Sequence, residues 1–156
     1  MDDAEPVLDV VVFGATGSIG RAIVGELVAR GHRVTGVTRT GAGTDRLPDG
    51  LELRTGDVTD PQDVAHWARG HDAVISAIGP RFGSDQSQPF VPAARGLVEG
   101  VRLAGLRRLL VVGGAGGLEV APGVQAVDTP EFPEAHKPNA LAQREALEFY
   151  RTVDDL

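Results

Sequence analysis

The sequence predicts an α/β fold in which a parallel sheet is covered by helices on both faces. Short runs rich in β-branched residues alternate with longer stretches whose apolar residues follow a helical period. Glycines stand at the ends of several of these segments, where a strand or a helix has to stop. The length of 156 residues suits one domain. We therefore expect residues 1–156 to form a single domain.

The expected elements follow from apolar periodicity and from residues that start or stop helices. Asp60 and Pro61 have the types of a helix cap and of a first helical residue. Residues 115–138 hold most of the late Gly and Pro and are interpreted as a long surface loop. Right-handed crossovers predict a doubly wound sheet with strand order 3-2-1-4-5. The strands are expected at residues 8–13, 33–38, 51–54, 72–78 and 108–112, and the helices at 19–29, 61–68, 90–104 and 139–150.

Composition excludes several classes of function. The chain has no Cys, which excludes disulfides, Cys-based metal sites and thiol nucleophiles. Its formal charge of −7 argues against a surface that coats nucleic acid. No apolar run approaches the roughly 20 residues of a membrane-spanning helix, and the acidic start is followed by no secretory apolar region. We expect a cytoplasmic protein without nucleic-acid or membrane partners; the oligomeric state stays open.

The most informative motif is the glycine pattern of residues 14–20, Gly-Ala-Thr-Gly-Ser-Ile-Gly, between an expected strand and an expected helix. Its first glycine permits a tight turn, its second lets a pyrophosphate approach backbone amides, and its third lets the helix pack on the sheet. The helix N-terminus then favours the anion. The alternative is a glycine-rich turn without a ligand. We assign to the cofactor Gly14, Thr16, Gly17, Ser18, Ile19 and Gly20.

The end of the second strand indicates which dinucleotide binds. An NAD-selective site has Asp or Glu there, which holds the ribose 2′-hydroxyl. This chain has Thr38 and Arg39 instead. Arg39 offers a guanidinium to a 2′-phosphate, and a charge-assisted contact of about 1.5–3 kcal/mol favours NADP roughly 10- to 100-fold. A solvated surface arginine is the alternative, and NAD then remains an option.

Two further strand ends support the predicted groove, because ligands of open α/β sheets bind at the carboxyl ends of the strands. Asp57, followed by Val58, has a carboxylate that can accept a hydrogen bond from the adenine amino group. Its alternative role is that of a helix cap or turn residue. The fourth strand ends at Ala77, Ile78 and Gly79, where small residues leave room beside the ribose and nicotinamide. Gly113, after the fifth strand, is also assigned to the cofactor.

With these motifs, the chain resembles the atypical short-chain dehydrogenase/reductases. It is most similar to the NmrA-like and biliverdin/flavin-reductase-like groups, often labelled NAD-dependent epimerase/dehydratase. Residues 109–116 and 140–145 are similar to that subgroup as well. The resemblance covers nearly the whole chain and implies a Rossmann-type sheet that binds NAD(P). Such relatives are usually longer, with a sixth strand and a C-terminal portion that shapes the substrate pocket. From the resemblance we expect that this chain lacks that portion and is either a minimal version or a fragment.

The chain departs from the superfamily's proton-transfer machinery. The well-known dehydrogenases use Tyr-x-x-x-Lys, in which the lysine lowers the pKa of the tyrosine. The sole Tyr and Lys, Tyr150 and Lys137, do not have this spacing. The serine expected after the fifth strand is absent as well, since residues 113–117 are Gly and Ala only. His136 is a weak catalytic candidate that could act as an acid or base near neutral pH; its alternative is a surface histidine. No group of His, Asp and Glu residues has the spacing of a metal site.

These observations predict an NADP(H)-binding oxidoreductase that passes hydride to a small electron-poor acceptor, such as a quinone, flavin or carbonyl compound. Such an acceptor can take its proton from water and does not need the missing tyrosine. One alternative is a regulatory protein that senses NADP without turnover. Another is an NAD(P)-dependent epimerase/dehydratase, which needs acid and base groups that the sequence does not identify.

Overall fold

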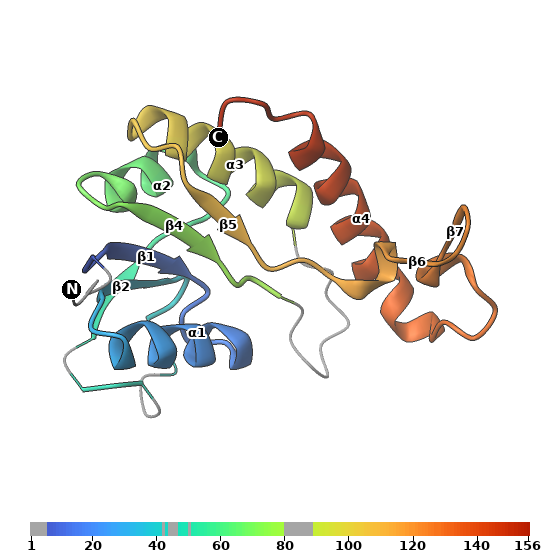
Figure 1. The fold of residues 1–156 in the computed structure, drawn as a ribbon, viewed down its shortest axis with the longest axis horizontal. Helices are drawn as coiled ribbons and strands as arrows, with labels where there is room; N and C mark the ends of the chain where they lie inside the picture. Colours follow the sequence, from blue (N-terminus) through green and yellow to red (C-terminus); the bar gives the residue numbers. More distant parts are fainter. Residues whose placement is uncertain (1–5, 42, 44–46, 50, 80–88) are drawn as a thin grey trace, which may run out of the picture.

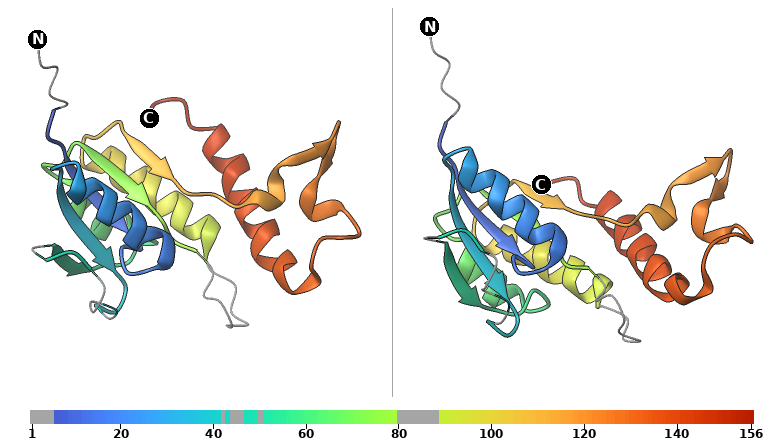
Figure 2. Two further views of the ribbon diagram at one scale, coloured as in Figure 1. Left: turned by 60° about the horizontal axis from the view of Figure 1, so that its bottom comes forward. Right: turned by 90° about the horizontal axis from the view of Figure 1, so that it is seen from below.

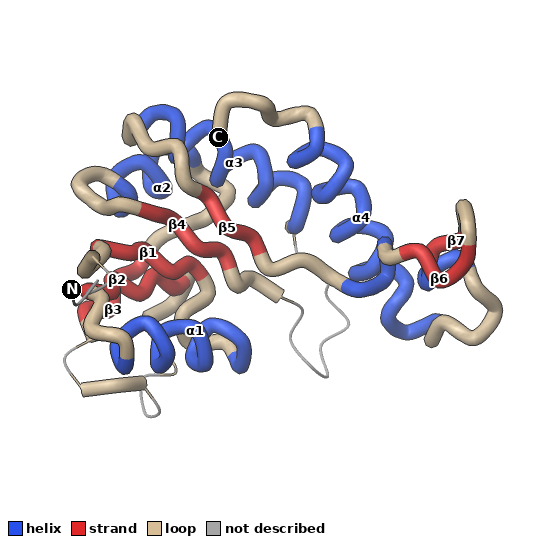
Figure 3. The backbone as a smooth tube through the Cα atoms, in the orientation of Figure 1, coloured by secondary structure: helices blue, strands red, loops and turns tan. Residues whose placement is uncertain are grey.

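A five-stranded parallel sheet forms the centre of the molecule (Figures 1 and 3). The computed structural model describes residues 6–41, 43, 47–49, 51–79 and 89–156. The strand order is β3-β2-β1-β4-β5, which confirms the predicted order. The expected fourth strand is three residues longer than the observed one, and the expected fifth strand is two residues longer. The strands are β1 (Asp9–Phe13), β2 (Arg33–Thr38), β3 (Glu52–Thr55), β4 (Ala73–Ser76) and β5 (Leu109–Val111).

Helices cover both faces of the sheet, as the views in Figures 1 and 2 show. Helix α1 (Ser18–Ala29) lies on one face, and α2 (Pro61–Ala68) and α3 (Phe90–Leu103) lie on the other. Strand β1 is central and buried, and its side chains alternate between the two layers. Val10 and Val12 pack toward α1, whereas the intervening Val11 and the following Phe13 pack toward α2 and α3.

Local chemistry explains where α2 begins and why it lies so close to α3. The Asp60 carboxylate accepts a hydrogen bond of 2.9 Å from the Gln62 amide, and Pro61 is the first helical residue, as predicted. A Cβ on Gly100 would lie 2.4 Å from the Cβ of Val64. A side chain at Gly100 is therefore incompatible with this helix–helix contact.

The segment expected to be a long loop contains regular structure, so that expectation was wrong. Strands β6 (Glu119–Ala121) and β7 (Val124–Gln125) form an antiparallel hairpin. Its turn is made by Pro122 and Gly123, and Gly123 has a φ of +72°. The strands are too short for a clear apolar alternation, which is why the pattern did not reveal them. Three short 3₁₀ turns complete the segment, at Ala115–Gly117, Ala126–Asp128 and Glu134–His136.

The last helix, α4 (Lys137–Arg151), packs on α3 beyond the β5 side of the sheet (Figure 1). It begins two residues earlier than expected because Pro138 is compatible with the first helical turn. Phe90 and Ala94 of α3 pack against Ala146 of α4. Within the described residues, no helix is long and apolar enough to cross a membrane.

Candidate cofactor-binding site

The predicted cofactor residues lie at one edge of the sheet, because all five strands are parallel and end there. Backbone hydrogen bonds continue the sheet past the strand ends. The Gly14 amide donates to the Val37 carbonyl at 2.9 Å, and the Ala77 amide donates to the Phe13 carbonyl at 2.9 Å. The turns that follow neighbouring strands are therefore held side by side. This edge is where open α/β sheets bind their ligands.

The turn after β1 is shaped by two glycines that contact backbone atoms. Gly14 has a φ of +79°, and a Cβ on it would lie 2.9 Å from the carbonyl oxygen of Ala77. A Cβ on Gly20 would lie 2.0 Å from the carbonyl oxygen of Gly14. The first turn of α1 therefore packs directly on the turn that precedes it. This is the close approach for which the first and third glycines were predicted.

The second glycine leaves the start of α1 open. Gly17 caps the helix in an extended conformation, and no side chain within the described part of the chain accepts a hydrogen bond from the first helical amides. Gly17, Ser18 and Ile19 are exposed, and Thr16 beside them is half-buried. The unpaired amides and the helix dipole suit a diphosphate, and an absent Cβ lets it come close. The residues present therefore fit a dinucleotide.

The end of β2 combines a fixed hydroxyl with an exposed cation. Thr38 is buried, and its hydroxyl oxygen accepts a hydrogen bond of 2.8 Å from the Gly41 amide. Arg39 follows in an exposed position and forms no ion pair with any residue that the structure describes. Its guanidinium is therefore available to an anion from solution.

Arg21 is a residue of this region that the sequence interpretation did not single out. It follows the third glycine on α1, and one guanidinium nitrogen donates to the Gly43 carbonyl at 3.2 Å. Its Nε is buried without a hydrogen-bond partner among the described residues. A Cβ on Gly43 would lie 3.2 Å from the Cβ of Thr16. Arg21 therefore connects the glycine turn to the segment after β2, a contact between residues too distant in sequence for a motif to reveal.

The remaining predicted residues occupy the other strand ends. Asp57 is a turn residue, because its Oδ1 accepts hydrogen bonds from the amide and hydroxyl of Thr59 at 2.9 and 2.8 Å. Its contact with adenine stays a prediction. Val58 is half-buried beneath it against the core. The predicted residues after β4 and β5 lie at the carboxyl ends of these strands. Ala77 is buried, Ile78 is half-buried, and Gly79 and Gly113 are exposed.

His136 lies apart from these residues. It is exposed and directly precedes the first residue of α4. Its ring forms no hydrogen bond with any residue that the structure describes. The neighbouring Lys137 pairs with Glu134. The catalytic role of His136 stays a prediction. Within the part of the chain that the structure describes, no cluster of acidic residues and histidines could hold a metal ion.

A parallel sheet of this order with a glycine turn after β1 defines a Rossmann-type dinucleotide-binding protein. Residues 14–153 match the family described as NAD(P)H-binding, and the chain belongs to that family. This confirms the predicted relationship to the atypical short-chain dehydrogenase/reductases. The match does not distinguish NADP from NAD, and the NmrA-like subgroup stays a prediction.

Similar proteins match nearly the whole chain. The uncharacterized protein YwnB of Bacillus subtilis strain 168 is 34% identical over 153 residues, which cover 93% of this chain and 66% of that protein. A Burkholderia pseudomallei structure, provisionally named an exported protein, is 44% identical with a TM-score of 0.82 and covers 96% of this chain. The chain spans 69% of that structure. It therefore has about two thirds of the length of these relatives.

Two further solved structures carry functional names. A Bacteroides thetaiotaomicron protein, provisionally named an epimerase, is 34% identical, with a TM-score of 0.83 over 97% of this chain and 68% of its own. A Streptococcus pneumoniae protein, provisionally named an NADH-flavin reductase, is also 34% identical, with a TM-score of 0.76 over 96% of this chain and 68% of its own. The family match shows an NAD(P)H-binding domain, and the names of these two structures differ in the reaction.

Proposed function

We propose that the chain binds NADP(H) at the carboxyl edge of the sheet and acts as a reductase of a small electron-poor acceptor. The observation that carries the cofactor choice is Arg39 at the end of β2, which is exposed and forms no ion pair with the residues that the structure describes. A carboxylate at this place would favour the ribose 2′-hydroxyl of NAD, whereas a guanidinium favours a 2′-phosphate. The uncapped amides of α1 would hold the diphosphate of the same molecule.

The reductase assignment is supported by the name of the Streptococcus pneumoniae structure and by the chemistry that this chain lacks. The cofactor, when bound, supplies a hydride. Tyr150 and Lys137 lie at opposite ends of α4, so they cannot form the usual proton-transfer pair. An acceptor whose reduced form takes its proton from water fits these residues. The role of the protein is then to bind and orient both reactants.

The test starts with calorimetric titration of the folded protein with NADPH and with NADH. We expect NADPH to bind more tightly, followed by steady NADPH oxidation when quinones, flavins or conjugated carbonyl compounds are added. Tight NADPH binding without oxidation by any acceptor would favour the NADP-sensing alternative. Absence of binding to both nucleotides would refute the proposal.

The epimerase/dehydratase alternative is supported by the name of the Bacteroides thetaiotaomicron structure. In such a reaction the cofactor is reduced and reoxidised within one turnover, so no net NADPH is consumed. It also needs a general acid and a general base. Net consumption of NADPH in proportion to the added acceptor would therefore exclude it.

A further inference from the structure

Arg21 places a positive charge in the first turn of α1. The partial positive charge of a helix N-terminus disfavours a cation there. This turn contains no acidic residue, and Arg21 forms no ion pair with any residue that the structure describes. The side chain is half-buried, and its Nε is buried without a hydrogen-bond partner among the described residues. The contacts that account for this arginine therefore lie outside α1.

The guanidinium of Arg21 links α1 to the segment that follows β2. One of its nitrogens donates a hydrogen bond of 3.2 Å to the Gly43 carbonyl. Gly43 has a φ of +87°, and a Cβ on it would lie 3.3 Å from that nitrogen and 3.2 Å from the Cβ of Thr16. Gly43 thus packs against the glycine turn and against Arg21 together. A side chain at Gly43 would disturb this contact.

Arg39 lies between two fixed points of the same segment. On one side, the hydroxyl oxygen of the buried Thr38 accepts a hydrogen bond of 2.8 Å from the Gly41 amide, which closes a turn around Arg39. On the other side, Arg21 holds Gly43. The Arg39 side chain is exposed and has no ion pair with any described residue. The position of its guanidinium therefore depends on the backbone that carries it.

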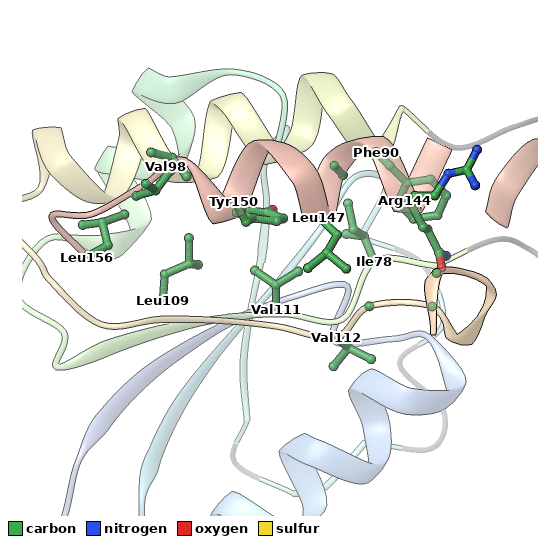
Figure 4. Close-up of a pocket in the computed structure, with 16 residues that line it drawn as sticks. Ile78, Phe90, Val98, Leu109, Val111, Val112, Arg144, Leu147, Tyr150 and Leu156 are labelled. Atoms are coloured by element: carbon green, nitrogen blue, oxygen red, sulfur yellow. The ribbon is translucent and has the colours of Figure 1, made fainter. Parts of the chain in front are cut away.

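The link made by Arg21 sets the spacing between the two ends of the proposed site. The amides at the start of α1 would hold the diphosphate, and Arg39 would hold the 2′-phosphate of the same nucleotide. Both groups belong to one molecule, so the amides and the guanidinium must stand at a matching distance. None of the residues that make this link lines the cavity between β5, α3 and α4 that Figure 4 shows. The spacing therefore does not depend on that cavity.

We propose that Arg21 is a positioning residue that favours NADPH by holding Arg39 at the 2′-phosphate. This role rests on the proposed function, because it assumes the nucleotide at the carboxyl edge of the sheet. The hydrogen bond to the Gly43 carbonyl orders the segment before the nucleotide arrives, so less conformational entropy is lost on binding. NADH has no 2′-phosphate and gains little from this order. Arg21 thus acts on cofactor selectivity through Arg39 and does not itself contact the nucleotide.

The test is a double-mutant cycle between Arg21 and Arg39. Arg21→Met removes the hydrogen-bond donors and the charge at a similar side-chain length, and calorimetry gives the Kd values of NADPH and NADH. Arg21→Met should weaken NADPH binding by roughly 2- to 10-fold, the factor that corresponds to one hydrogen bond, and leave NADH binding nearly unchanged. In the Arg39→Ala background, Arg21→Met should change neither affinity further.

Gly43→Ala disturbs the same contact from the other side and keeps the charge of Arg21. It should also lower the preference for NADPH over NADH, which separates positioning from a simple attraction between charges. Gly43 lies outside every helix and strand, so this variant tests the contact even if Arg21→Met does not fold. The control is Arg30→Met, because Arg30 follows the other end of α1 and pairs with Glu26. It should leave both affinities unchanged.

Equal losses for NADPH and NADH in Arg21→Met would overturn the positioning role, because they would show an effect on the part that both nucleotides share. A loss for NADPH that persists in the Arg39→Ala background would overturn it too, since Arg21 would then act on the phosphate itself. If Arg39→Ala lowers the preference for NADPH but Arg21→Met and Gly43→Ala do not, the positioning role fails and the proposed function stands. If the wild type does not bind NADPH, or Arg39→Ala leaves its preference unchanged, the cofactor choice of the proposed function fails, and the positioning role with it.

Discussion

The Cα atom of Gly20 faces the carbonyl of Gly14 so closely that a Cβ would lie 2.0 Å from that oxygen. Any side chain at Gly20 must therefore displace either α1 or the turn before it. The contact positions the exposed amides at the start of α1, on which the proposed diphosphate site depends. Packing and cofactor binding are thus coupled at one glycine.

Gly20→Ala should destabilise the fold by about 1–3 kcal/mol, because the added methyl group meets backbone that cannot turn aside. It should also weaken NADPH binding. The matched control is Gly25→Ala on the same helix, where a Cβ meets nothing within 4 Å. That change should stabilise the protein by about 0.5–1 kcal/mol through better helix propensity. Urea unfolding and NADPH titration measure both effects; equal behaviour of the two variants would contradict the role of the contact.

Arg39→Ala should weaken NADPH binding by roughly 10- to 100-fold and leave NADH binding nearly unchanged, because only NADPH carries the 2′-phosphate. The control is Arg69→Ala. Arg69 is also exposed, but it follows α2 and lies near the amino ends of the strands, opposite the predicted cofactor site. Calorimetry with both nucleotides gives the two affinities. Equal losses for NADPH and NADH would show that Arg39 does not select the cofactor.

Leu97→Ala should lower the free energy of unfolding by about 2–5 kcal/mol, because Leu97 is fully buried between α3 and the sheet. Leu103, on the same helix, has 45% of its surface exposed. Leu103→Ala should therefore change stability by less than about 0.5 kcal/mol. Chemical denaturation of both variants measures the difference. A similar loss in both would mean that α3 does not bury the face that the structure shows.

The pair between Asp9 and Arg33 should make stability depend on pH. The Arg33 guanidinium donates two hydrogen bonds of 2.5 Å and holds the pKa of the Asp9 carboxyl below its ordinary value of 3.8. Because the folded-state pKa is depressed, the stabilisation is present above about pH 4 and is lost as pH falls through the lower folded-state value. The stability difference between wild type and Asp9→Asn should therefore shrink in acid. A difference that stays constant down to about pH 3 would contradict this assignment.

Local sequence features determined the sheet order, the start of α2 and the glycine turn. Alternating apolar periods identify strands and helices, and crossover handedness then limits their order. Asp60 and Pro61 act within one helical turn, and Gly14, Gly17 and Gly20 act within a single connection. These interactions involve residues close together in the chain, which is why the pattern alone could predict them.

Only the tertiary structure decided how distant segments meet. The β6–β7 hairpin is too short to have a recognisable period. The contact of Arg21 with Gly43 and that of Gln143 with Gly114 join segments separated by 20 or more residues. Helix α4 packs on α3 and also contacts the segment after β5, where a Cβ on Gly116 would lie 2.7 Å from the Cβ of Ala140. The sequence by itself thus determined the elements and the cofactor turn, whereas side-chain packing between remote elements determined how α4 is placed beside α3 and the sheet.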